Sequence, residues 1–372
     1  MTFIPYAKQS IDSADIEAVT QVLQSDWLTQ GPKVAEFEAA LSEATGAPYV
    51  VVVSNGTAAL HLACLAAGLK PSDIGVTSAI GFVASANAIR YAGATPCLAD
   101  INPETGLMTL ETLQRAATRP KVIIPVDLTG SVPDLPAIQK WATAVGATVI
   151  EDAAHALGAT YQHEGCIYRA ASCVHSDMAI LSFHPAKQIT TGEGGAICTR
   201  DAKLYECLLE LRTHGITKNA AKLSTQEGWW HEQQALGFNY RLTDIQCALG
   251  LSQIRKLDRF VQRRREIAAL YDRAFPHMRL RVPEGVKSAY HLYVIQVPRR
   301  RCVYEELAKN NIGTQVHYIP IYKQPDFARF NLGELPGAEK YYANCLSLPM
   351  FPAMTDLDTN RVIETLQSIL RR

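Results

Sequence analysis

Short strand-like runs alternate with helical stretches from about residue 14 to residue 250, and this alternation constrains the fold more than any other feature. The strand-like runs are Tyr49–Val53, Ile74–Thr77, Val122–Asp127, Thr148–Asp152, Met178–Phe183 and Gly195–Thr199. The helical stretches include Thr57–Ala67, Phe82–Ala92, Pro133–Ala144 and Leu204–Arg212. Such alternation builds βαβ units, which form a mostly parallel sheet with helices on both faces. We therefore predict an α/β fold and expect ligands in the loops at the carboxyl ends of the strands.

The pattern changes after residue 250. A long helical pattern runs from Thr243 to Phe275, interrupted only by Gly250. After it we predict a strand, a helix, a second strand and a final helix, at His291–Val297, Tyr304–Asn310, Thr314–Tyr318 and Asp356–Leu370. Because single cores stop growing near ~250–300 residues, the 372 residues of the chain favour two domains. We expect a large domain over residues 1–245, and the connecting helix with a smaller α+β domain over residues 246–372.

Composition and charge narrow the functional classes. The 36 basic and 36 acidic residues balance, so the chain has no electrostatic footprint for nucleic acid or for an anionic membrane. The basic clusters Arg263–Arg265 and Arg299–Arg301 are typical of a solvated helix face and a turn. The start of the chain lacks the regions of a signal peptide, and no apolar run approaches the ~20 residues that span a bilayer. The nine cysteines include no C-x-x-C pair, which disfavours disulfides and a metal site. We expect a cytoplasmic protein.

The segment Ser54-Asn55-Gly56-Thr57-Ala58-Ala59-Leu60 follows a predicted strand and opens a predicted helix. A helix N-terminus presents unpaired N–H groups and a partial positive charge, so it is a natural anion site. Gly56 lets the backbone approach an anion closely, and Thr57 can add a hydroxyl donor. The same residues also suit a simple strand-to-helix turn with Ser or Thr as the N-cap. This motif alone leaves both interpretations open.

A second motif, Glu151-Asp152-Ala153-Ala154-His155-Ala156, ends a predicted buried strand. An acidic residue in that place is costly unless a positive group meets it. A protonated pyridine nitrogen is one such partner, because a carboxylate beside it keeps the ring of a cofactor an effective electron sink. The alternatives are a carboxylate that caps the next helix and, for His155, a histidine satisfied within the core.

Lys187 lies in the third motif, Ser182-Phe183-His184-Pro185-Ala186-Lys187-Gln188-Ile189-Thr190-Thr191-Gly192-Glu193-Gly194-Gly195. A lysine becomes a useful nucleophile toward aldehydes when burial and positive neighbours lower its pKa. The glycines let the backbone wrap closely around a flat ligand. Ser182 and Thr190 add candidate phosphate donors on either side. The alternative is a surface lysine in a hairpin.

The fourth motif, Gly237-Phe238-Asn239-Tyr240-Arg241-Leu242-Thr243-Asp244, precedes the long helical pattern. Its Asn, Tyr and Arg side chains suit contacts with a phosphate across a subunit boundary. The segment is also typical of an ordinary helix start with Thr243 as the N-cap.

Together and in this order, the four motifs resemble those of the DegT/DnrJ/EryC1/StrS sugar aminotransferases, over the chain from Pro5 to about Leu370. The resemblance implies the type I (aspartate aminotransferase) fold of enzymes that use pyridoxal 5′-phosphate (PLP), with a mostly parallel seven-stranded sheet. It also implies a homodimer with shared active sites. Lys187 would carry PLP as a Schiff base, Asp152 would pair with the pyridine nitrogen and His155 would lie close to the ring. The remaining PLP contacts would be Phe82, stacked on the ring, and Thr57, Ala58, Ser182 and, from the neighbouring subunit, Asn239 at the phosphate.

Within the family, the chain is most similar to the C4 aminotransferases of pseudaminic acid biosynthesis. The cues are Ile4-Pro5-Tyr6, the Lys187 loop and Val316-His317-Tyr318-Ile319-Pro320-Ile321-Tyr322. This resemblance implies L-glutamate as the amino donor and a UDP-linked 4-keto-6-deoxy-N-acetyl-altrosamine as the acceptor. His317 and Tyr318 would line the sugar pocket, or pack locally at a strand end. Arg241 would contact the donor's carboxylate or the nucleotide diphosphate, or form a salt bridge at the dimer interface.

Other functions on this fold stay open. They include C4 or C3 amination of a dTDP- or GDP-linked keto-sugar, and 3-dehydration of a keto-sugar. The dehydration branch typically has histidine where Lys187 stands, so Lys187 disfavours it. A PLP-binding protein without catalysis, acting as a sensor or scaffold, is the alternative from another class. The intact Lys187, Asp152 and phosphate loop disfavour that role.

Overall fold

The computed structural model describes residues 2–371 except 218, 226 and 331, and a seven-stranded sheet forms the centre of this part. Its strands, in the order in which they lie side by side, are β1 (Tyr49–Val53), β9 (Gly195–Thr199), β8 (Met178–Ser182), β5 (Thr148–Asp152), β4 (Val122–Ile124), β2 (Ile74–Ser78) and β3 (Thr95–Ala99). The strands from β8 to β3 pair in parallel, whereas β9 runs antiparallel to both of its neighbours. The predicted mostly parallel sheet is confirmed.

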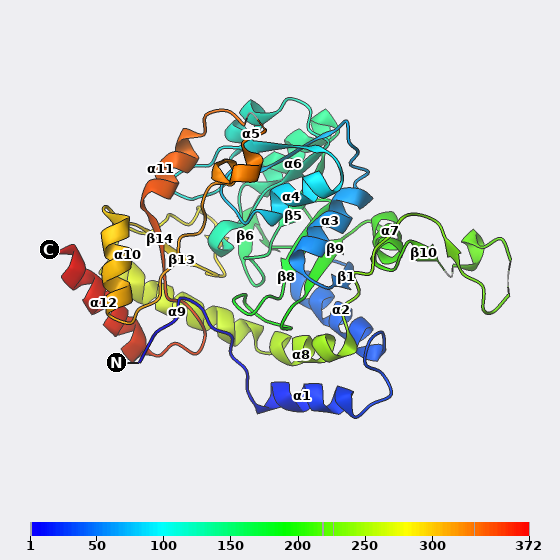
Figure 1. Cartoon of the computed structure of the whole chain (residues 1–372), viewed down its shortest axis with the longest axis horizontal. Helices are drawn as coiled ribbons and strands as arrows, with labels where there is room; N and C mark the ends of the chain where they lie inside the picture. The colour runs from blue at the N-terminus through cyan, green and yellow to red at the C-terminus, as the bar shows by residue number, and fades with distance from the viewer. Residues whose placement is uncertain (1, 218, 226, 331, 372) are drawn as a thin grey trace.

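Helices cover both faces of this sheet (Figure 1). Alternate residues of a strand point to opposite faces, so Val51 and Val53 of β1 pack with one helix layer and Val50 and Val52 with the other. The first layer consists of α3 (Gly56–Ala66), α4 (Ala84–Tyr91) and α7 (Ala202–Arg212). On the opposite face lie α2 (Pro32–Thr45), α5 (Leu110–Ala116) and α6 (Leu135–Val145). Burial on both faces explains why these strands read as continuous apolar runs.

The predicted long helix is two helices, α8 (Asp244–Ile254) and α9 (Leu257–Ala274). The break falls after Ile254 and not at Gly250, which lies inside α8. A Cβ atom on Gly250 would lie 2.5 Å from the Phe37 ring of α2. The glycine therefore marks close helix packing and not a helix end. In Figure 1, α8 and α9 run beneath the sheet toward α12 (Asp356–Leu370).

The C-terminal part contains an antiparallel pair, β13 (Tyr293–Gln296) with β14 (Cys345–Leu348), packed against α9, α10 (Arg300–Lys309) and α12. The sequence predicted a strand at Thr314–Tyr318, and this prediction is wrong. Only Gln315 pairs there, as an isolated bridge to Ser347. The helix α11 (Pro336–Asn344) precedes β14. Ile4 bridges Ile312, so the N-terminal segment lies on this C-terminal part.

The other elements are shorter or peripheral: α1 (Ser13–Leu23), β6 (Thr160–His163), β7 (Cys166–Arg169), β10 (Ile216–Thr217), β11 (Glu232–Gln233), β12 (Val286–Lys287) and short 3-10 turns at Leu128–Gly130, Ala220–Lys222, Ile321–Lys323 and Pro325–Phe327.

The prediction that Arg263–Arg265 form a solvated helix face is wrong for Arg264, which is only 1% exposed on α9. Among the residues described, no helix combines the length and apolar character needed to cross a membrane.

Candidate active site

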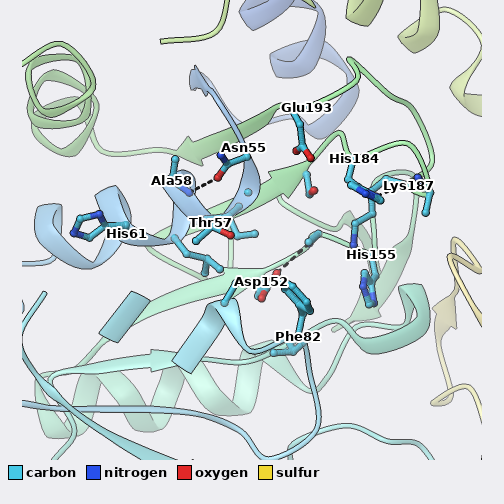
Figure 2. Close-up of a pocket in the computed structure, with 18 of the residues that line it drawn as sticks. Asn55, Thr57, Ala58, His61, Phe82, Asp152, His155, His184, Lys187 and Glu193 are labelled. Carbon is cyan, nitrogen blue, oxygen red and sulfur yellow. Dashed lines mark hydrogen bonds between the residues drawn. The ribbon is translucent and has the colours of Figure 1, made fainter. Parts of the chain in front are cut away.

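A cavity of about 850 Å³ opens at the carboxyl ends of β5 and β8, beside the N-terminus of α3. The sequence-predicted residues that line it are Thr57, Ala58, Phe82, Asp152, His155, Ser182, Lys187, His317 and Tyr318. Figure 2 shows Thr57 and Ala58 on one side of the cavity and Lys187 and His155 on the other, with Asp152 and Phe82 between them. The loops at the strand ends thus place the separate motifs around one space, as expected for such sheets.

The N-terminus of α3 forms one end of the cavity. Its N-cap is Asn55 and not a Ser or Thr, because the Ala58 N–H donates to Asn55 Oδ1 at 2.8 Å. A Cβ atom on Gly56 would lie 3.1 Å from Ser182 Cβ, so the helix start and the end of β8 are in contact. A Cβ atom on Gly195 would lie 2.6 Å from the Asn55 carbonyl group. The close approach of three backbone segments thus builds a helix terminus of the kind that suits an anion.

Lys187 lies in the loop between β8 and β9, where its N–H donates to the His184 carbonyl oxygen at 2.8 Å. The Gln188 side-chain amide donates to the His155 carbonyl oxygen and ties this loop to the segment after β5. Burial lowers the pKa of Lys187 to about 8, with Arg264 acting in the same direction and Asp152 opposing it. About a tenth of the amine is therefore neutral at pH 7, far more than for an exposed lysine, and the neutral form is the one that a nucleophile or base requires.

Asp152 ends β5, and its side chain is buried. Its Oδ2 accepts a hydrogen bond from Ser85 Oγ at 2.6 Å, and its Oδ1 accepts one from the Ala154 N–H at 3.3 Å. Burial raises the pKa of Asp152, while Ser85 and Lys187 oppose that rise. Ser85 was not predicted from the sequence, where its one signal was its place in a predicted helix, three residues after Phe82.

Phe82 is 58% exposed, although Ala79 and Ile80 just before it are fully buried. Its ring faces the cavity, with the Tyr318 ring centroid 6.1 Å away. An exposed aromatic face at the wall of a cavity suits a flat ligand that stacks on it.

Three histidines form the side of the cavity near Lys187. The Tyr318 hydroxyl lies 3.2 Å from His155 Nε2, and the rings of His155 and His291 lie 4.2 Å apart. Burial lowers the pKa of both imidazoles well below the usual histidine value, with the Lys187 charge adding to the effect. Within the part of the chain that is described, the Nδ1 atoms of both rings are buried without a partner. His155 is therefore not the fully satisfied core histidine that the sequence left open.

His317 is the third of these rings, and its Nδ1 lies 2.8 Å from Ser347 Oγ. Burial lowers the pKa of His317 to about 4, and Lys187 adds to this shift. The Tyr6 ring lies 5.5 Å from it. No role was predicted for Tyr6 or His291 from the sequence, because neither belongs to a motif that adjoins Lys187 or Asp152 in the chain.

Asn239 and Arg241 are not among the residues that line the cavity. Their segment is extended, with bridges from Asn239 to Thr213 and from Arg241 to Val53. Because alternate side chains of an extended segment point to opposite sides, Phe238 and Tyr240 reach the cavity instead. The Asn239 side chain is exposed and Arg241 is half-buried.

The residues around the cavity fit PLP on chemical grounds. An anion-binding helix terminus, an exposed aromatic ring, a buried carboxylate and a lysine amine correspond to its phosphate, flat ring, ring nitrogen and aldehyde. Lys187 would hold the aldehyde carbon, Asp152 the ring nitrogen, Phe82 one ring face and the start of α3 the phosphate.

Comparisons with known proteins agree with this chemistry. The model of the DegT/DnrJ/EryC1/StrS aminotransferase family matches residues 9–367. The spore coat polysaccharide biosynthesis protein SpsC of Bacillus subtilis is 36% identical over 387 aligned residues, which cover 99% of this chain and 97% of SpsC.

Solved structures extend the comparison. PseC of Helicobacter pylori, an aminotransferase involved in the biosynthesis of pseudaminic acid, matches with a TM-score of 0.91 and 31% identity, and 100% of each chain is covered. The PLP form of Spr1654, a candidate sugar aminotransferase of Streptococcus pneumoniae, matches with a TM-score of 0.89 and 30% identity over 99% of each chain.

Proposed function

This chain belongs to the DegT/DnrJ/EryC1/StrS aminotransferase family, and from that premise we propose that it moves the amino group of L-glutamate to C4 of a UDP-linked 4-keto-6-deoxy-N-acetyl-altrosamine. The chain is a PLP-dependent sugar aminotransferase with the predicted type I fold. The observation that carries the proposal is the Lys187 amine at the wall of one cavity with Asp152 and the α3 N-terminus. Similarity to PseC, at 31% identity over the whole chain, supports the C4 step of pseudaminic acid biosynthesis.

Lys187 moves the proton in both half-reactions. When bound, PLP supplies an aldehyde that condenses with amines and a ring that takes up the electrons of a cleaved C–H bond. Lys187 Nζ removes the proton from the α-carbon of glutamate, and it delivers a proton to C4 of the sugar in the second half-reaction. Its pKa of about 8 suits a group that must both take and give a proton.

The other residues bind and orient. The Asp152 carboxylate, held by Ser85, stabilises positive charge at the ring nitrogen. Phe82 covers one face of the ring and excludes water from it, and Thr57, Ala58 and Ser182 hold the phosphate. His155 stays beside the ring through its contact with Tyr318. His317 and Tyr318 line the space for the sugar.

The site is shared between two copies of the chain in a homodimer. The exposed side chain of Asn239 supports this, because it is free to reach the phosphate of a second chain. Arg241 contacts the donor's carboxylate or the diphosphate of the nucleotide across the same boundary. The cytoplasmic location expected from the sequence stays a prediction.

A second candidate is the amination of a different nucleotide-linked keto-sugar, carried by dTDP or GDP or aminated at C3. The 36% identity to SpsC, a protein of spore coat polysaccharide biosynthesis, favours this alternative. The catalytic residues would be the same, because only the sugar and the nucleotide differ. A PLP-binding protein without catalysis is disfavoured by the aminotransferase family match.

Absorbance of the purified, PLP-loaded protein tests the proposal. Glutamate alone is added first and a panel of nucleotide-linked keto-sugars second. Glutamate should bleach the band of the lysine-bound cofactor, and only the UDP-linked altrosamine ketone should restore it. Restoration by another keto-sugar instead would support the second candidate, and no change with glutamate would overturn the role of Lys187.

A further inference from the structure

Arg264 is a buried cation on α9 and the largest fully buried side chain among the described residues. In the part of the chain that the structure describes, its hydrogen-bond partners are all backbone carbonyl oxygens. A buried guanidinium without a carboxylate partner carries a large desolvation cost. The contacts and charges around Arg264 indicate what this buried cation does.

The carbonyl partners of Arg264 belong to two regions of the molecule. Nη1 donates to the carbonyl oxygens of His291 and Met350, each at 3.1 Å, just before β13 and just after β14. Nη2 donates to the carbonyl oxygens of Ala186 and Lys187, at 3.4 and 3.5 Å. The planar fork therefore connects the Lys187 loop to the two strands of the C-terminal part, a geometry that a lysine cannot reproduce.

The groups around the Lys187 amine differ in charge. Asp152, at the end of β5, supplies a negative charge. The imidazoles of His155, His291 and His317 stay neutral, because burial lowers their pKa. Arg264 keeps its proton at neutral pH, since burial lowers its pKa only to about 10. Of the described groups that act on the amine, Arg264 is thus the one that supplies a permanent positive charge.

We propose that Arg264 is a positioning residue for Lys187. Its hydrogen bonds to the Ala186 and Lys187 carbonyl oxygens fix the loop, and its guanidinium holds a permanent positive charge near the amine. The charge favours the neutral amine, and the hydrogen bonds fix the backbone from which the amine reaches the cavity. This inference rests on the proposed function of Lys187 as the residue that binds PLP and moves the proton. It explains why a basic residue faces inward in a cluster whose neighbours, Arg263 and Arg265, lie nearer the surface.

The capture of PLP by the apoprotein tests the inference without any turnover. The rate at which Lys187 binds PLP is measured against pH, by absorbance and by borohydride reduction with peptide mapping. The wild-type rate should rise with pH through a midpoint near 8, where the amine loses its proton. Arg264→Gln keeps hydrogen-bond donors but removes the charge, so the midpoint should rise by about one pH unit. At about pH 7.5 the capture rate should then fall about eightfold and recover at high pH.

Two further variants separate charge from structure. Arg264→Lys keeps the charge and loses the fork, so it should retain the wild-type midpoint with a lower maximal rate. Arg265→Gln is the matched control, because Arg265 also donates to backbone carbonyl oxygens from α9, those of Ser288 and Gly158. It should lose stability but keep the midpoint.

The outcomes are distinguishable. A wild-type midpoint in Arg264→Gln overturns the inference, whatever happens to the maximal rate. If that variant does not fold, a raised midpoint in Arg264→Lys overturns it instead. Failure of the wild-type protein to bind PLP at Lys187 would overturn the proposed function itself.

Discussion

The two ends of the cavity are built in different ways. The phosphate end, named for its proposed ligand, consists of Asn55–Ala58 with Ser182 and Gly195, and it uses backbone N–H groups and short side chains. The histidine end consists of His155, His291, His317 and Tyr318, and it uses buried rings from separate segments. Backbone donors keep their protonation state at all accessible pH values but tolerate no added volume. Buried imidazoles respond to pH and to the loss of a single hydrogen bond.

Lys187 lies beside the histidine end (Figure 2), and its replacement should have the largest effect. Lys187→Ala removes the base and the point of covalent attachment, while the phosphate end remains. We expect turnover to fall by about 10⁴-fold, with some PLP still bound. Single-turnover absorbance with glutamate measures the first effect and equilibrium dialysis the second. Near-normal turnover in this variant would contradict the assignment.

Acid should weaken the histidine end. The pKa of His317 is about 4 in the folded protein and about 6.5 in an unfolded chain. Because the folded pKa is depressed, its stability contribution is complete above about pH 6.5 and is lost as the pH falls toward 4. The loss from this residue is about 3 kcal/mol. Urea unfolding of wild type and His317→Gln across this range should show a shallower pH dependence in the variant. Equal slopes would contradict the prediction.

Added volume should damage the phosphate end. In Gly195→Ala the new Cβ would lie 2.6 Å from the Asn55 carbonyl group, which forces β9 away from the start of α3. We expect a loss of about 2 kcal/mol in stability and weaker PLP binding, measured by thermal unfolding and by titration. Gly228→Ala is the control, because a Cβ atom there has no described neighbour within 4 Å. An equal effect in both variants would refute this account.

The smallest effect concerns one hydrogen bond at the histidine end. Tyr318→Phe removes the hydroxyl that faces His155 Nε2 and leaves a buried nitrogen without that partner. We expect a loss of about 1 kcal/mol in stability and a reduced kcat for the sugar half-reaction. Tyr322→Phe removes an exposed hydrogen bond to Glu339 and should change neither quantity measurably. A wild-type kcat in Tyr318→Phe would leave Tyr318 with a packing role only.

From the sequence we predicted candidate site residues in contiguous motifs at strand ends, and most of them line the cavity. Thr57, Asp152 and Lys187 line one cavity, because each lies at the carboxyl end of a strand or in the segment that follows it, in a mostly parallel sheet. Ser85 and His291 were missed because their roles depend on partners more than 60 and 130 residues away in sequence, such as Asp152 and His155.

The sequence by itself determined the alternating α/β order and the chemistry of the motifs, because both depend on residues close together in the chain. The predicted strands Thr148–Asp152 and Gly195–Thr199 match β5 and β9 at both ends. Only the tertiary structure decided that Thr314–Tyr318 forms a single bridge and not a strand. The tertiary structure also decided that Arg264 is buried, with its guanidinium donating to the Lys187 carbonyl oxygen. Strand pairing and the burial of a charge depend on long-range partners, and these meet only when the chain has folded.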